Sequence, residues 1–112
     1  RVGSPGYPTP LEYRMRLASR AYDRAFRPLG HARQTHAILA TGSFEGLLPQ
    51  IVAPTQVIHG LADPLIRPEG GRRSARLIRG SRLALIPGMG HDLAPSLMPQ
   101  WAELIAGNAA RA

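Results

Sequence analysis

The sequence predicts an α/β fold in which two parallel strands alternate with helices. Residues 55–60 (TQVIHG) and 81–88 (SRLALIPG) are short apolar runs of strand-like composition. A helical pattern follows each run, over residues 67–80 and from residue 96 onward. Strand, helix, strand and helix in this order imply parallel strands that are joined by a right-handed crossover.

A proline-rich segment precedes the first predicted helix. Residues 1–10 contain three Pro and two Gly, so this segment is expected to be extended or turning. The helical period begins at Leu11, with Thr9 as the N-cap and Pro10 in the first turn, and it ends near Pro28. One face of this helix is apolar. The other face contains four arginines, which we interpret as the solvated side of an amphipathic helix: Arg16, Arg20, Arg24 and Arg27.

The remaining elements complete the pattern. Residues 30–41 predict a second helix, and residues 44–51 predict a short helical turn. Pro54 prevents helix continuation beyond this turn. The apolar face of the last helix is expected to contain Leu97, Trp101, Leu104 and Ile105, with Trp101 and Met98 in the core.

Composition limits the possible classes of protein. The chain has 112 residues, which suffices for one ordinary domain but not for two. It has no Cys, so disulfides, thiolate metal sites and Cys nucleophiles are excluded, and we expect a cytoplasmic location. No apolar run approaches the roughly 18 to 20 residues of a membrane span. The first ten residues also lack the apolar stretch of a secretory signal.

The charge suggests one alternative function. The net charge is +7 and all 14 basic residues are Arg, which could form a nucleic-acid or anionic-surface binding module. Its contact face would comprise Arg16, Arg20, Arg24, Arg27, Arg72, Arg73, Arg76 and Arg79. We favour scattered, solvated arginines, because the absence of Lys indicates a compositional bias and no nucleic-acid signature or interleaved aromatic set is present. Neither nucleic acid nor membrane is therefore expected as a partner.

Two chemically suitable side chains follow the two predicted strands. Asp63 lies in the loop after the first strand, and His91 lies in the loop after the second. Because the carboxyl ends of parallel strands meet at one edge of a sheet, we expect these side chains to lie close together. A hydroxyl nucleophile at neutral pH needs a base such as His, and a carboxylate that accepts the other N–H fixes the tautomer. The pair therefore predicts a catalytic acid, Asp63, and a catalytic base, His91.

Asp63 also has a structural interpretation, and so do other acidic and histidine residues of the chain. An Asp before a proline, such as Asp63, is also typical of a turn that caps the next helix. Asp92 is adjacent to His91, but we interpret it as a local turn or capping group because neighbouring side chains in an extended loop diverge. His59 is interpreted as a satisfied, partly buried histidine. The other histidines have no carboxylate at a metal-ligand spacing, so we expect neither a metal nor a cofactor.

The sequences "PTQVIHGLADPL" (residues 54–65) and "IPGMGHDL" (residues 86–93) resemble the last third of an α/β-hydrolase. The chain order in that family is nucleophile, acid, base. The resemblance is closest to small-ester hydrolases similar to aclacinomycin methylesterase. It implies that Asp63 is the triad acid, that His91 is the triad base and that the substrate is a small-molecule ester or a similar compound. It also implies that residues 1–50 are the end of a helical cap with its return helix, and that residues 51–112 are the C-terminal βαβα unit of the core.

The nucleophile motif of that family, Gly-x-Ser-x-Gly, is absent from the sequence. Ser43 follows Gly42, but Thr41 and Glu45 occupy the positions of the two motif glycines, so we interpret Ser43 as a helix-end turn residue. The resemblance therefore implies a C-terminal fragment that is inactive alone. Its nucleophile, Ser or in some relatives Asp, would lie on sequence absent here. An inactive hydrolase remnant is the second alternative, and the oligomeric state stays open.

Overall fold

The computed structural model describes residues 2–112, which form two compact units. Residues 2–9 and Glu45–Ala112 form one unit, called here the sheet unit, and Pro10–Phe44 form the other, called here the two-helix unit. The resemblance to α/β-hydrolases implies a different division, between a cap region at residues 1–50 and a core region at residues 51–112. This division stays a prediction. The N-terminal residues 2–9 thus belong to the same unit as Asp63 and His91.

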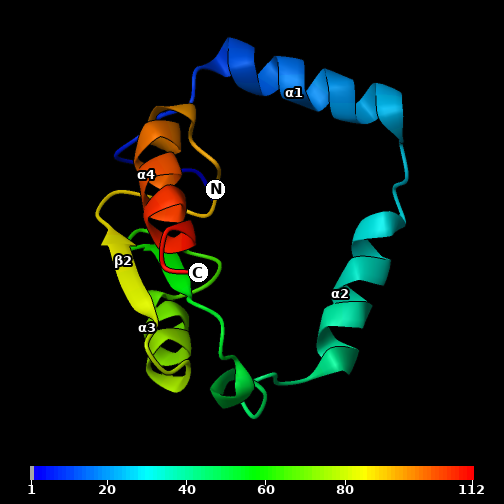
Figure 1. Ribbon diagram of the computed structural model, residues 1–112. Coiled ribbons are helices and arrows are strands. Elements are labelled where there is room, and N and C mark those ends of the chain that lie inside the picture. Colours follow the sequence, from blue (N-terminus) through cyan, green and yellow to red (C-terminus); the bar gives the residue numbers. More distant parts are fainter. Residues whose placement is uncertain (1) are drawn as a thin grey trace. The chain divides into compact units, whose positions relative to one another are not determined.

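The sheet unit contains two parallel strands, β1 (Gln56–Gly60) and β2 (Arg82–Ile86) (Figure 1). Val57 lies opposite Leu83 and Gly60 lies opposite Ile86, so both strands end at the same edge. The chain therefore combines helices with two parallel strands, as the sequence predicts. The strands are one to three residues shorter than the predicted runs.

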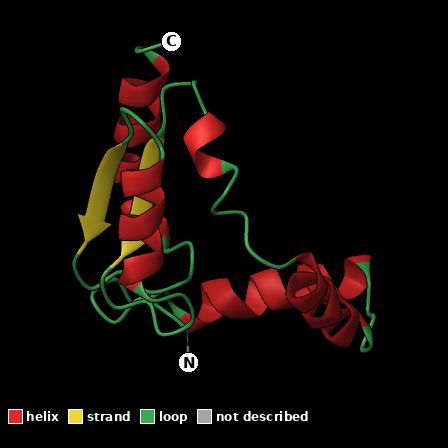
Figure 2. Ribbon diagram, turned by 90° about the horizontal axis from the view of Figure 1, so that it is seen from below, coloured by secondary structure: helices red, strands yellow, loops and turns green. Residues whose placement is uncertain are grey.

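Two helices cover this sheet, α3 (Pro68–Leu77) between the strands and α4 (Met98–Ala109) after a 3-10 turn at Pro95–Leu97. Successive side chains of a strand point to opposite faces. Ile58 packs toward the core that includes Trp101 of α4, whereas the ring of His59 lies against Gly71 of α3. The two helices therefore cover opposite faces of the sheet, and Figure 2 shows the strands and helices as adjacent layers.

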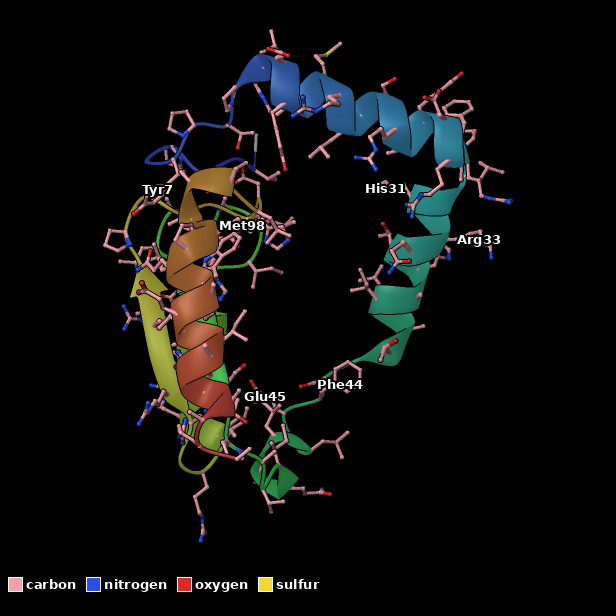
Figure 3. The ribbon with its side chains drawn as sticks, turned by 45° about the horizontal axis from the view of Figure 1, so that its top comes forward. Tyr7, His31, Arg33, Phe44, Glu45 and Met98 are labelled. Atoms are coloured by element: carbon pink, nitrogen blue, oxygen red, sulfur yellow. The ribbon has the colours of Figure 1, made fainter. Side chains whose placement is uncertain are left out.

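A small core holds the loop after β2 against α4. It consists of Ile86, Ala94, Leu97 and Trp101, and Tyr7, Ile58 and Met89 pack against it. Figure 3 shows Tyr7 and Met98 near the N-terminal end of α4. The prediction for Trp101 is confirmed, but the prediction for Met98 is wrong, since this residue is 46 % exposed. Leu97 and Trp101, four residues apart, lie on the buried side of this region, whereas Met98 and the predicted apolar-face residue Ile105 lie outside the core.

The two-helix unit contains α1 (Leu11–Arg24) and α2 (Gly30–Thr41). Helix α1 ends four residues before Pro28, because Ala25 adopts an extended backbone with φ −166° and ψ 102°. Neither helix contains a buried residue, and Figure 3 shows side chains such as Arg33 projecting from α2. The apolar stripe of α1 is therefore exposed rather than packed. None of the helices within residues 2–112 combines the length and apolar content of a membrane span.

Candidate acid–base site

The structure brings Asp63 and His91 into direct contact at the carboxyl end of the sheet. Nδ1 of His91 lies 2.8 Å from Oδ2 of Asp63, although the two residues are 28 positions apart. The side chain of Asp63 is 6 % exposed and that of His91 is 43 % exposed. An ionised carboxylate only accepts hydrogen bonds, so Nδ1 holds the proton in this contact. In the neutral imidazole the lone pair is then on Nε2, the nitrogen that a general base uses.

The two carboxylate oxygens of Asp63 have different partners. Oδ1 accepts hydrogen bonds from the backbone N–H of Leu65 at 2.8 Å and of Ile66 at 2.9 Å. Oδ2 accepts from His91. Asp63 therefore does both things that the sequence suggests. Its Oδ1 stabilises a local turn, and its Oδ2 contacts His91. The helix-capping alternative is wrong, because α3 begins only at Pro68.

The environment of Asp63 favours its ionised form. Burial acts to raise the pKa of this carboxyl group, but hydrogen bonds from Ile66, His91 and Leu65 outweigh burial, so the pKa lies below the ordinary value of 3.8. At neutral pH the group is therefore a carboxylate. This charge state is required both for accepting the Nδ1 proton and for stabilising an imidazolium.

We expect Asp63 to contribute stability at neutral pH that is lost in acid. Its pKa is lower in the folded than in the unfolded chain, so the contribution is fully present above the ordinary pKa of 3.8 and disappears as the pH falls below that value through the folded pKa. Urea unfolding from about pH 6 to about pH 2 should show a weaker pH dependence for Asp63→Asn than for the wild type. The exposed Glu103 offers a matched control, Glu103→Gln. Equal slopes for wild type and Asp63→Asn would contradict this prediction.

Close backbone contact fixes the two loops relative to each other. The N–H of Leu61 donates to the carbonyl of Ile86 at 3.0 Å, and the N–H of Ala62 donates to the carbonyl of Met89 at 2.9 Å. A Cβ atom at Gly60 would clash with the carbonyl oxygen of Met89. Gly60 therefore provides space for this approach, and a larger residue would separate the loop of Asp63 from the loop of His91.

His59 lies beside this pair and is satisfied, as expected. Its Nε2 lies 2.9 Å from the carbonyl oxygen of Ile66 and 3.9 Å from Oδ2 of Asp63. The carbonyl can only accept, so Nε2 of His59 donates to it. This bond closes the loop that contains Asp63.

The interpretation of Asp92 as a local turn or capping group is wrong. Its Oδ1 accepts a hydrogen bond from the hydroxyl of Ser4 at 2.5 Å, and its Oδ2 lies 3.5 Å from the hydroxyl of Thr9. Thr9, predicted as the N-cap of the first helix, thus contacts Asp92, and α1 has no side-chain cap. Ser4 is a residue of the site that the sequence did not indicate, since no local pattern links positions 88 residues apart.

Three serine hydroxyls of the sheet unit donate hydrogen bonds to groups other than His91, so none of the three is paired with this base. The hydroxyl of Ser4 donates to Asp92, that of Ser74 donates to the carbonyl of Gly70, and that of Ser81 donates to the carbonyl of Ala75. Within residues 2–112, no group of three His, Cys, Asp or Glu side chains could hold a metal ion. No protein-family model matches the chain.

Proposed function

We propose that this chain supplies the general base and its orienting acid to an α/β-hydrolase that cleaves a small-molecule carboxylic ester or a similar acyl bond. The observation that supports this function best is the 2.8 Å contact between a buried carboxylate and a half-exposed imidazole after two parallel strands. The order acid then base along the chain agrees with the order in that family. His91 is the proposed base and Asp63 the proposed acid.

In the proposed reaction, a hydroxyl from sequence outside these 112 residues attacks the acyl carbon. Nε2 of His91 takes the hydroxyl proton, and the Asp63 carboxylate stabilises the resulting imidazolium through Nδ1–H. The imidazolium then gives its Nε2 proton to the departing alkoxide, which leaves as an alcohol. Water then attacks the acyl carbon of the intermediate, and Nε2 of His91 takes one proton from that water. The carboxylic acid leaves, and His91 returns the proton to the oxygen of the nucleophile. In relatives with an Asp nucleophile, the same pair would activate the water.

The arginine-rich binding module has less support. Arg73, one member of its contact face, forms a two-point ion pair with Glu45 at 3.0 Å and 3.2 Å. This pair lowers the pKa of Glu45 through the hydrogen bond from Arg73. Part of the arginine set is therefore neutralised within the sheet unit, and we propose no nucleic-acid function.

We expect the 112-residue chain alone to hydrolyse an ethyl ester no faster than its His91→Ala variant. The reason is that the base has no placed hydroxyl to activate, and direct attack by an imidazole does not expel an unactivated alkoxide. Initial rates at neutral pH measure this, with His36→Ala as a control for an exposed histidine elsewhere. Hydrolysis that persists in His36→Ala and is lost in His91→Ala would contradict this prediction and show that the nucleophile is in this chain.

The coding sequence upstream of Arg1 provides a second test. We expect a strand-like run, a Gly-x-Ser-x-Gly motif and a helical pattern in that order. A reading frame that lacks such a motif would overturn the serine-type reaction. An Asp at the equivalent strand-to-helix turn would instead assign the nucleophile to the second class of relatives.

A further inference from the structure

The N-terminal segment, residues 2–9, lies against the loop that contains His91, residues 87–92, called here the His91 loop. The N–H of Gly6 donates to the carbonyl of Gly88 at 2.9 Å, and the N–H of His91 donates to the carbonyl of Val2 at 2.8 Å. The second bond holds the backbone of His91 itself. The N-terminal segment is therefore part of the acid–base site, although Val2 is 89 residues away from His91 along the chain.

Ser4 is at the centre of this contact. The residue is 4 % exposed, and its hydroxyl oxygen accepts a hydrogen bond from the N–H of Gly90 at 2.8 Å while it donates to Oδ1 of Asp92 at 2.5 Å. One hydroxyl thus bonds the residue before His91 and the residue after it. The carboxylate of Asp92 is held toward the N-terminal segment, so the Nδ1 proton of His91 is paired with Asp63 alone.

The backbones in this contact approach each other too closely for a side chain to lie between them. A Cβ atom at Gly90 would lie 2.6 Å from the carbonyl oxygen of Gly3, and one at Gly6 would lie 2.9 Å from Cα of Gly88. Gly88 has a φ of 72°, which L side chains rarely adopt. A glycine-rich loop is flexible unless other groups fix it. Here the N-terminal segment fixes the loop together with the backbone contact from Ala62 to Met89.

We propose that Ser4 and Asp92 are positioning residues for His91. This inference rests on the proposed function. The His91 side chain is 43 % exposed, so packing alone holds it weakly, and its orientation depends on the Asp63 bond and on the fixed backbone of its loop. Loss of the Ser4 hydroxyl releases Gly90 and Asp92 together. The freed Asp92 carboxylate then competes with Asp63 for the ring N–H of His91, and a hydrogen bond from Nε2–H to Asp92 favours the other tautomer.

The test is nuclear magnetic resonance of the His91 imidazole in the full 112-residue chain, with ¹⁵N–¹H correlation and hydrogen exchange. The wild type should show the Nδ1–H tautomer. Ser4→Ala should show mixed tautomers and at least tenfold faster exchange of both the Nδ1 proton and the His91 amide proton. Asp92→Ala, which removes the acceptor of the Ser4 hydroxyl, should also speed both exchanges, and Ser4→Thr, which keeps the hydroxyl, should give the wild-type spectrum. Ser74→Ala, which removes a hydroxyl that bonds only within α3, is the matched control and should leave His91 unchanged.

The outcomes separate this inference from the proposed function. A wild-type spectrum without an Nδ1–H preference overturns the Asp63–His91 pair and with it the proposed function. An Nδ1–H preference and exchange rates that stay unchanged in both Ser4→Ala and Asp92→Ala overturn the positioning role alone. The indole signal of Trp101 reports whether each variant keeps its core. If Ser4→Ala loses that signal, Asp92→Ala, at a partly exposed position, decides the result.

Discussion

Replacement of His91 by Ala in a full-length enzyme that contains the nucleophile is expected to lower turnover by about four orders of magnitude. This variant removes the Nε2 atom that takes and returns the proton. Asp63→Asn should cause a loss of similar size, because its amide can donate a hydrogen bond to Nδ1 and so favours the wrong tautomer. Steady-state kinetics should show the loss mainly in kcat, since neither change removes a proposed substrate contact.

The same enzyme allows a stricter comparison. The double variant, with both His91→Ala and Asp63→Asn, should be little slower than His91→Ala alone, because the acid acts only through the base. His36→Ala and Asp23→Asn make the same chemical changes on exposed helices and should keep near wild-type rates. An enzyme that tolerates either single change at the site would refute the assigned roles.

Leu97→Ala is expected to lower the free energy of unfolding by about 2 to 5 kcal/mol. Leu97 is almost fully buried between Ile86, Ala94 and Trp101, so truncation leaves a cavity in a core that has few other members. Urea unfolding at neutral pH measures the loss. Ile105→Ala, on the same helix but 61 % exposed, should change stability by less than about 0.5 kcal/mol. Equal effects of the two changes would show that this cluster is not the core of the sheet unit.

The sequence predicted the elements that have a strong period or composition. The two β-rich runs and the helices after them gave the parallel pair, and the rule for carboxyl ends of parallel strands gave the proximity of Asp63 and His91. The end of α1 was not predictable from the pattern, since apolar spacing continues to Phe26 beyond the break at Ala25. The ring centroids of Tyr22 and Phe26 are still 4.9 Å apart across this break, so the two rings remain in contact.

The contacts that could not be predicted are those between distant segments. Ser4 and Asp92 are each unremarkable in their local sequence, and only the folded chain shows that one hydroxyl joins them. Met98 was misplaced for a related reason. A shift of one residue along a helix changes the stripe on which a side chain falls, and the apolar spacing does not define which stripe the sheet covers.

Residues 10–44, the two-helix unit, form a single insertion in the sequence of the sheet unit. Both of its junctions are attached by side chains, Thr9 near Asp92 on one side and Glu45 to Arg73 of α3 on the other. The free-energy cost of closing such an insertion grows only slowly with its length. The insertion can therefore be lengthened, shortened or exchanged while the strand register and the acid–base pair stay the same. It is the part of the chain best able to diversify.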